Sequence, residues 1–225
     1  MRRPSSVDAL AEFGRARLSR SFFMRDFLYS DIAALHGFSN VPDDPDLAIT
    51  AGTKLCTELL EPLQDVFGRI AIRSAYRSAE VNGFGNQMQR DKKKGYNCAS
   101  NESNYGHHIW DRRDAEGNMG ATACVVIPAF YDAFHAEGDW QKLAWWIHDH
   151  VAEFHSLFFF PKLAAFNIRW LEDAPLRDSI RTHVRNPNTG DKAALVVRGV
   201  PTLSDSARAE SWRRAFDSIE TYANG

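Results

Sequence analysis

The feature that most constrains the fold of this chain is a helical stripe, a run of apolar residues at helical spacing, which is followed directly by a strand pattern. The apolar residues that recur at helical spacing are Leu55, Cys56, Leu59, Leu60, Leu63, Val66 and Phe67. Gly68 follows the stripe and predicts the end of the helix. Residues 70–73 then alternate between isoleucine and other side chains, which predicts a short half-buried strand ending at Ser74. A helix and a strand so close together predict a fold that mixes both.

The rest of the chain continues this mixture without a regular strand–helix–strand order. Further predicted elements are a strand at 123–127, a helix at 140–151, strands at 156–160 and 165–171 joined by a hairpin at 161–164, and a helix near 205–222 with Trp212, Phe216 and Ile219 on one face. Residues 83–106 are rich in Gly, Asn, Lys and Ser and predict a long loop. The expected class is therefore α+β, with a small central antiparallel sheet flanked by helices.

Composition excludes several classes of protein. The formal net charge is −2, which gives no basic surplus for general nucleic-acid binding. No apolar run approaches the ~18 residues that a membrane span needs, and no apolar stretch follows the basic start as in a secretory signal. Three cysteines are too few for a disulfide framework, so free thiols in a reducing compartment are expected. We therefore expect a cytoplasmic protein with no nucleic-acid or membrane partner.

Several short segments in the first half of the chain match the pattern of one known family. They are Phe27–Ser30, Ala34–Gly37, Asn40–Pro42, Leu60–Leu63 and Phe67–Gly68. The most specific piece is Ile72–Ser78 followed by Asn82, which matches an S-x-Y-R-S-x-x-x-N element. With these segments the chain resembles the zinc D-alanyl-D-alanine carboxypeptidase family, which shares its fold with the zinc-binding domain of Hedgehog proteins. The resemblance implies one such domain at 21–175, preceded by a polar arm or short helix at 1–20 and followed by an extension at 176–225 packed on it.

The family holds zinc through S-x-H-x-x-x-G-x-A-x-D and E-x-x-W-H motifs, with the Glu as general base. The resemblance implies that His108 is the first ligand and that Cys124, in place of the Asp, is the second. Thiolate is an accepted zinc ligand, so this replacement is compatible with coordination. In the second motif Asn167 stands in place of the Glu, and Leu171 stands in place of the His. Asn167 cannot take a proton at neutral pH, which predicts altered chemistry at that position.

A third metal ligand has to come from elsewhere, because leucine has no donor atom. One candidate is His155, which the predicted hairpin would place beside Trp170, next to Leu171. The other is Asp111, three residues after His108, where a turn would let both side chains reach one ion; the alternative is an Asp that caps a polar turn. His107 is expected to point away from His108 on extended backbone. The metal would be zinc or another divalent ion such as iron.

Arg77 is the best-supported residue for binding a substrate. The resemblance implies that it holds a substrate carboxylate or a developing oxyanion, and a guanidinium fork suits a carboxylate; pairing with Glu80 is the alternative. Asn82 is expected to bind substrate or to tie the following loop together. Arg169 would share a strand face with Asn167, which favours an anionic ligand over proton abstraction.

Two classes of function remain open from these residues. The first is a divergent metal-dependent hydrolase acting on a small amide, peptide or carboxylate-bearing substrate, with Arg77 and Asn167 in catalytic roles. The second is a non-catalytic binding or accessory module that keeps the peptidase fold and the Arg77 pocket.

Overall fold

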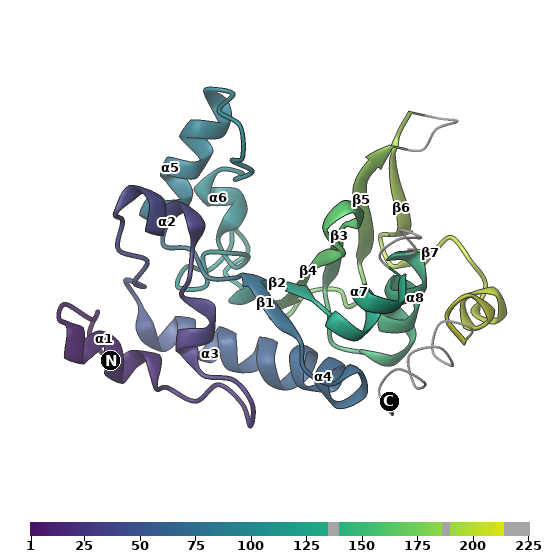
Figure 1. Cartoon of the computed structure of the whole chain (residues 1–225), viewed down its shortest axis with the longest axis horizontal. Coiled ribbons are helices and arrows are strands. Elements are labelled where there is room, and N and C mark those ends of the chain that lie inside the picture. The colour runs from purple at the N-terminus through teal and green to yellow at the C-terminus, as the bar shows by residue number, and fades with distance from the viewer. Residues whose placement is uncertain (135–139, 186–189, 214–225) are drawn as a thin grey trace. The chain divides into compact units, whose positions relative to one another are not determined.

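The computed structural model describes residues 1–134, 140–185 and 190–213, and its chain forms two compact units. Unit 1 comprises Met1–Thr57, Ser74–Ala123 and Arg169–Asp173, and unit 2 comprises Glu58–Arg73, Cys124–Ile168 and Ala174–Gly225. Figure 1 labels the elements of both. The predicted division of the chain after residues 20 and 175 stays a prediction. Within the described ranges, no helix is both long enough and apolar enough to cross a membrane.

Unit 1 is mainly helical. Its helices are α1 (Val7–Gly14), η1 (Met24–Phe27), α2 (Asp31–His36), α3 (Pro45–Leu55), α5 (Ala79–Arg90) and α6 (Asn101–Asn104). Each α-helix of this unit begins behind a side chain that accepts a backbone N–H of the first turn; these caps are Ser6, Ser30, Asp44, Ser78 and Ser100. Such caps satisfy donors that the helix itself cannot use, which explains why these short helices start where they do. The segment 1–20 therefore contains a short helix, one of its two expected forms.

The core of unit 1 centres on Trp110, which is fully buried. Its ring lies 5.4 Å from Phe27 and 6.1 Å from Tyr76, and its indole nitrogen donates to the carbonyl of Thr122 at 3.2 Å. Helix α3 passes close to the indole at Gly52, where an added Cβ would lie 2.9 Å from a ring carbon. This packing fixes the chain on both sides of His108 and Asp111 in a rigid environment.

The predicted helical stripe is confirmed, and the helix starts earlier than its apolar residues do. Helix α3 begins at Pro45, and the turns continue through the π-helical η2 (Cys56–Leu60) into α4 (Glu61–Phe67). Pro62 lies in the first turn of α4 and has no N–H to donate to the preceding turn, which accounts for the widened turn before it. The helix ends as predicted at Gly68, whose φ is +70°.

The strands form a mixed sheet that belongs mostly to unit 2; Ser74, Gly120–Ala123 and Arg169–Leu171 are assigned to unit 1. In the part of the chain that the structure describes, the strands are β1 (Ala71–Ser74), β2 (Gly120–Val126), β3 (Ser156–Phe160), β4 (Ala165–Leu171), β5 (Ser179–Arg185), β6 (Lys192–Val197) and β7 (Val200–Pro201). Their order is β1-β2-β4-β3-β5-β6-β7. The expected α+β class is confirmed, and the sheet is mostly antiparallel, as expected, although its seven described strands make it larger than the small sheet that was predicted. β3 and β5 run parallel with Ser156 opposite Ser179, whereas β5–β6 and β6–β7 are antiparallel (Figure 1).

The local predictions for unit 2 are largely confirmed. Besides α4, its helices are α7 (Pro128–Phe134), α8 (Trp140–His150), η4 (Pro161–Leu163) and residues 205–213. Strands β3 and β4 are neighbours joined by η4 and by Ala164, which adopts φ +45°. The predicted last helix is confirmed as far as residue 213 and includes Trp212, whereas Phe216 and Ile219 lie outside the described residues.

The expected long loop at 83–106 is wrong. Much of it belongs to α5 and α6. Ser78 caps α5, and Val81 and Gly85 form its buried face. Gly85 is required by packing, because a Cβ there would lie 2.6 Å from Cys98 Sγ and 2.8 Å from the end of Ile32. The glycine content of this segment favoured a loop in the sequence analysis, yet one of these glycines, Gly85, allows the helix to pack against its neighbours.

The close contact at Gly85 gives a testable prediction about stability. We expect Gly85→Ala to lower the free energy of unfolding by about 1–3 kcal/mol, because the new methyl group overpacks the contact with Cys98. Gly83→Ala is the matched control on the same helix, since its Cβ would meet only Asn101 at an ordinary 3.5 Å. The control should be neutral or stabilising by up to about 1 kcal/mol. Urea unfolding measures both, and equal effects would contradict the packing explanation.

Candidate functional site

The side chain of Arg77 is held in unit 1 by a cysteine. Its Nη1 contacts Cys98 Sγ as a hydrogen-bond donor. The backbone of Cys98 is fixed in turn by helix α5, because Asn86 donates to its carbonyl and Gln89 accepts its N–H. The alternative pairing of Arg77 with Glu80 has no support among these contacts. A long arginine side chain with a fixed partner loses less conformational freedom when it binds a ligand.

His108 is bonded to the backbone of Arg77. The backbone N–H of Arg77 donates to the His108 carbonyl at 2.9 Å, and the buried imidazole Nδ1 lies 2.8 Å from the carbonyl of Ala75. Burial, followed by the charges of Arg77 and His107, holds the pKa of His108 well below its usual value, and Arg169 acts in the same direction. The ring is therefore neutral near pH 7. Because a carbonyl only accepts, Nδ1 carries the proton, and Nε2 is the acceptor nitrogen.

The expectation that His107 points away from His108 is wrong. Residues 106–108 form a turn rather than extended backbone, and the two imidazole rings lie 4.8 Å apart. Gly106 begins this turn at φ +61°, a conformation that favours glycine. Its N–H donates to the carbonyl of Arg112 at 2.8 Å, which closes the loop.

Arg169, from the end of β4, is the second cation of this region. Its Nε and Nη2 both donate to the Gly106 carbonyl, at 3.0 and 2.9 Å. Burial lowers the pKa of Arg169, while the carboxylates of Asp114 and Glu116 act to raise it. The guanidinium is thus anchored to the same turn that carries His107 and His108. Arg77 and Arg169 both act to lower the pKa of His108, and the nearby negative charges of Asp114 and Glu116 act on Arg169.

The side chain of Asp111, which was predicted as a metal ligand, bonds to a backbone N–H. Its Oδ2 accepts the backbone N–H of Asp43 at 2.7 Å. Burial raises the pKa of Asp111, and burial together with the Asp111 carboxylate raises the pKa of Tyr76. The carboxyl of Asp111 thus ties together two loops that are distant in the sequence, which is neither the predicted metal contact nor the predicted cap of its own polar turn.

The remaining predicted site residues, Cys124, His155 and Asn167, belong to unit 2. Cys124 is buried in β2, with Arg73 Nη1 3.9 Å from its sulfur. His155 Nδ1 lies 2.9 Å from the carbonyl of Pro175. Asn167 is half-buried in β4. Across the described ranges, no three or more His, Cys, Asp or Glu side chains form a group that could hold a metal ion. The four predicted ligands are therefore not brought together as a set.

Asn82 has the loop-tying role that was expected as one of its two possibilities. It is fully buried, and its Nδ2 donates to the Ala99 carbonyl at 3.1 Å and to Asn101 Oδ1 at 2.9 Å. The amide thus joins α5 to the start of α6. Its predicted contact with substrate stays a prediction.

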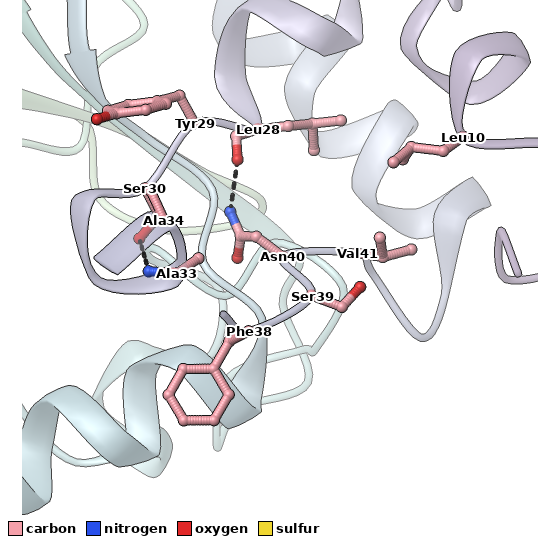
Figure 2. Close-up of a pocket in the computed structure, with 10 residues that line it drawn as sticks. All are labelled: Leu10, Leu28, Tyr29, Ser30, Ala33, Ala34, Phe38, Ser39, Asn40 and Val41. Atoms are coloured by element: carbon pink, nitrogen blue, oxygen red, sulfur yellow. Dashed lines mark hydrogen bonds between the residues drawn. The ribbon is translucent and has the colours of Figure 1, made fainter. Parts of the chain in front are cut away.

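A separate pocket of about 290 Å³ opens in unit 1. Figure 2 shows its lining, which is Leu10, Leu28, Tyr29, Ser30, Ala33, Ala34, Phe38, Ser39, Asn40 and Val41. No charged side chain is among them. Ser30 Oγ accepts the N–H of Ala33, and Asn40 Nδ2 donates to the carbonyl of Leu28. This pocket is apolar, unlike the cationic region around His108, so the two features suit different ligands.

The buried neutral state of His108 predicts a pH dependence of stability. The unfolded chain binds a proton at His108 below about pH 6.5 while the folded chain does not, so stability is lost as the pH falls below that value. The slope for one such group approaches about 1.4 kcal/mol per pH unit. We expect His108→Gln to show a shallower decline in urea stability between pH 6.5 and 5. Parallel curves for the two proteins would contradict a buried neutral imidazole.

Reasoning from the sequence missed Cys98 as a partner of Arg77. The two residues lie 21 positions apart, and no motif connects them. Comparisons of the chain with protein-family models, with curated proteins and with solved structures find no match. The functional assignment therefore depends on the geometry of these residues.

Proposed function

We propose that unit 1 binds a small ligand through a carboxylate group, with Arg77 as the principal contact. The observation that carries this proposal is the placement of Arg77: its Nη1 contacts Cys98 Sγ, and its backbone N–H donates to the carbonyl of the buried His108. Arg77 and Arg169 both act to lower the pKa of His108, whose neutral ring adds no charge of its own, so an anion bound to Arg77 would be stabilised there. Acids, and peptides with a free C-terminus, are the ligand class that fits.

The chemistry of the arginine supports a carboxylate over other anions. A guanidinium presents parallel N–H donors that match the two oxygens of a carboxylate, and Nη1 is already oriented by Cys98. Partial burial strengthens such a pair compared with one on an open surface. His108 adds polar surface without adding a positive charge. The function is therefore recognition of a carboxylate end, within a fold that we propose is of the D-Ala-D-Ala carboxypeptidase type.

A metal-dependent hydrolase is the second candidate, and one observation favours it. The contact of His108 Nδ1 with the Ala75 carbonyl fixes the tautomer whose Nε2 suits a metal or a proton. The other donors do not fit a zinc site in the same way, because Asp111 is engaged by Asp43 and no three-residue group forms among the described residues. When bound, zinc would supply a Lewis acid to the site. Carboxylate binding is for this reason the first proposal.

Calorimetric titration tests the proposed function. N-acetylalanine and N-acetylalaninamide are a matched pair that differ by a carboxylate and a neutral amide. We expect the acid to bind with a Kd of about 1 mM or tighter, equivalent to about −4 kcal/mol, and the amide to show no measurable binding. Equal or absent binding of both compounds would contradict the proposal.

Zinc loading tests the second candidate in the same preparation. One bound zinc per chain after dialysis, lost in His108→Gln, would favour the hydrolase. No retained zinc would count against the hydrolase. We also propose that the protein works in the cytoplasm on a small-molecule or peptide ligand, in keeping with three cysteines that are all free thiols.

A further inference from the structure

The main chain around Arg77 is held by the side-chain amide of Asn40. Asn40 Oδ1 accepts the backbone N–H of Ser78 at 2.8 Å, and its Nδ2 donates to the carbonyl of Tyr76 at 3.0 Å. The residues on either side of Arg77 are therefore both bonded to one amide group. The same Nδ2 also donates to the Leu28 carbonyl at 2.9 Å, as drawn in Figure 2.

The side-chain amide of Asn40 supplies backbone hydrogen bonds of the kind that a neighbouring strand would otherwise supply. Residues 75–78 are in neither a helix nor a strand, so their backbone groups have no ladder partners. Two further backbone bonds hold the segment, from Tyr76 N–H to the Phe27 carbonyl at 3.2 Å and from Arg77 N–H to the His108 carbonyl at 2.9 Å. A buried backbone group without a partner is costly, so each bond fixes the segment in one conformation.

We propose that Asn40 is a positioning residue for Arg77, which sets the direction of the guanidinium and hence the affinity for a carboxylate. The inference rests on the proposed function of Arg77. The Cα–Cβ direction of Arg77 follows from the backbone at Tyr76 and Ser78, and both of these residues are bonded to Asn40. A small rotation of this backbone moves the end of a long side chain by a much larger distance.

Asparagine has the chemistry that this position needs. The site requires one acceptor for Ser78 and two donors for the carbonyls of Tyr76 and Leu28, and a primary amide supplies both kinds of group. In Asn40→Asp the acceptor stays, but a carboxylate would face two carbonyl oxygens. In Asn40→Leu the shape is similar and no charge is added, but every polar contact is lost. The two variants separate the effect of charge from the effect of positioning.

The first test needs no ligand. In a nitrogen-15 NMR spectrum, the backbone amide of Arg77 should exchange slowly with solvent, and its side-chain Nε–H should give one defined signal, identified by its absence in Arg77→Lys. In Asn40→Asp and Asn40→Leu we expect faster exchange of this amide and a shifted or broadened Nε–H signal. Unchanged exchange and an unchanged signal in both variants would overturn the proposal.

The second test measures affinity for N-acetylalanine. Both Asn40 variants should bind it roughly tenfold more weakly, which corresponds to about 1.4 kcal/mol. Thr182→Val is the control for general destabilisation, because it removes a buried hydrogen bond from Thr182 to the Phe159 carbonyl in unit 2; its affinity and its Arg77 signals should match the wild type. Binding that is lost in Arg77→Lys but kept in the Asn40 variants would refute the positioning role alone. Failure of the wild type to bind would refute the proposed function, while the NMR test would still decide whether Asn40 positions Arg77.

Discussion

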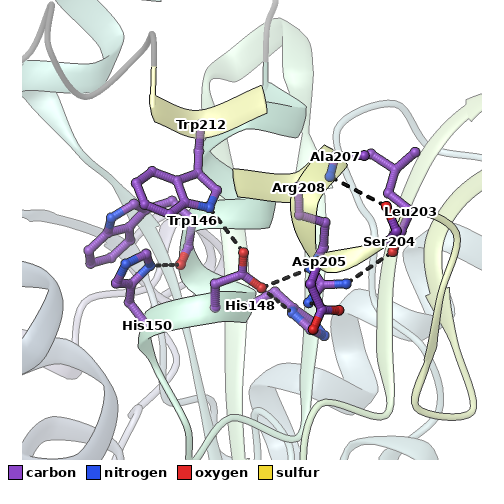
Figure 3. Close-up of polar contacts among 10 residues, drawn as sticks. Trp146, His148, His150, Leu203, Ser204, Asp205, Ala207, Arg208 and Trp212 are labelled. Carbon is purple, nitrogen blue, oxygen red and sulfur yellow. Dashed lines mark hydrogen bonds and ion pairs between the residues drawn. The ribbon is translucent and has the colours of Figure 1, made fainter. Parts of the chain in front are cut away.

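Replacement of Asp149 by alanine is expected to lower the free energy of unfolding by about 2–4 kcal/mol, because it leaves a buried arginine without its main partner. Asp149 and its partners form a polar cluster in unit 2, and Figure 3 labels three of these partners, His148, Arg208 and Trp212. Asp149 Oδ1 accepts Arg208 Nε at 2.8 Å and lies 2.9 Å from His148 Nδ1, while Oδ2 accepts the indole N–H of Trp212 at 3.0 Å. One carboxylate thus joins helix α8 to residues 205–213.

The expected loss is large because the partners are poorly exposed. The side chain of Arg208 is 10% exposed and that of Asp149 is 17% exposed, so water cannot fully replace the lost contacts. Burial acts to raise the pKa of Asp149, but the hydrogen bonds from His148, Arg208 and Trp212 outweigh it and lower the pKa. The folded state therefore favours the ionised carboxylate, and this contribution to stability disappears in acid as the pH falls through the lowered pKa.

Asp205→Ala is the matched control for this prediction. Asp205 contacts the same arginine, with Nη2 at 3.1 Å, but its side chain is 98% exposed. An exposed pair of this kind contributes at most about 1 kcal/mol. Urea unfolding followed by tryptophan fluorescence should show a much larger loss for Asp149→Ala than for Asp205→Ala. Equal losses would mean that burial does not determine the strength of the cluster.

Replacement of Arg77 by lysine is expected to weaken carboxylate binding by about ten- to a hundredfold, the effect of about 1.5–3 kcal/mol for hydrogen bonds to a charged group. Lysine keeps the charge but loses the planar fork and the oriented contact with Cys98. The expected change is therefore in affinity and not in folding. Calorimetric titration with N-acetylalanine measures it, with thermal unfolding as the check that the variant is folded.

Arg73→Lys is the corresponding control in unit 2. Arg73 also approaches a cysteine, with Nη1 3.9 Å from Cys124 Sγ, but it plays no part in the proposed site. Its replacement should leave the affinity for N-acetylalanine unchanged. If both variants bind as tightly as the wild type, Arg77 is not the contact for the carboxylate.

The elements that could be predicted from the sequence are those whose signal is local. The helical stripe ending at Gly68 has a clear period, the strands on either side of Pro161 are short runs rich in apolar residues, and the structure has all three elements. The parallel pairing of β3 with β5 depends on residues distant in the chain, which no period in the sequence encodes. Helix α5 was missed for a related reason, because the role of Gly85 is visible only beside Cys98.

In the candidate site, too, some residues have a local sequence signal and others are found only from tertiary contacts. Arg77 and His108 were identified from motifs, and the structure links the Arg77 backbone to the His108 carbonyl. The partners that orient Arg77 could not be identified in the same way. Cys98 contacts its guanidinium, and Asn40 bonds to the residues on either side of it. These contacts arise from tertiary packing, so the sequence pattern identifies Arg77 but not the residues that contact it.

A crystal structure of the protein with N-acetylalanine tests the central claim most directly. It should show both carboxylate oxygens at hydrogen-bond distance, about 2.7–2.9 Å, from the guanidinium of Arg77. The imidazole of His108 should remain in place, with Nδ1 against the carbonyl of Ala75. A carboxylate bound elsewhere on the molecule, with Arg77 making no contact to it, would contradict the account.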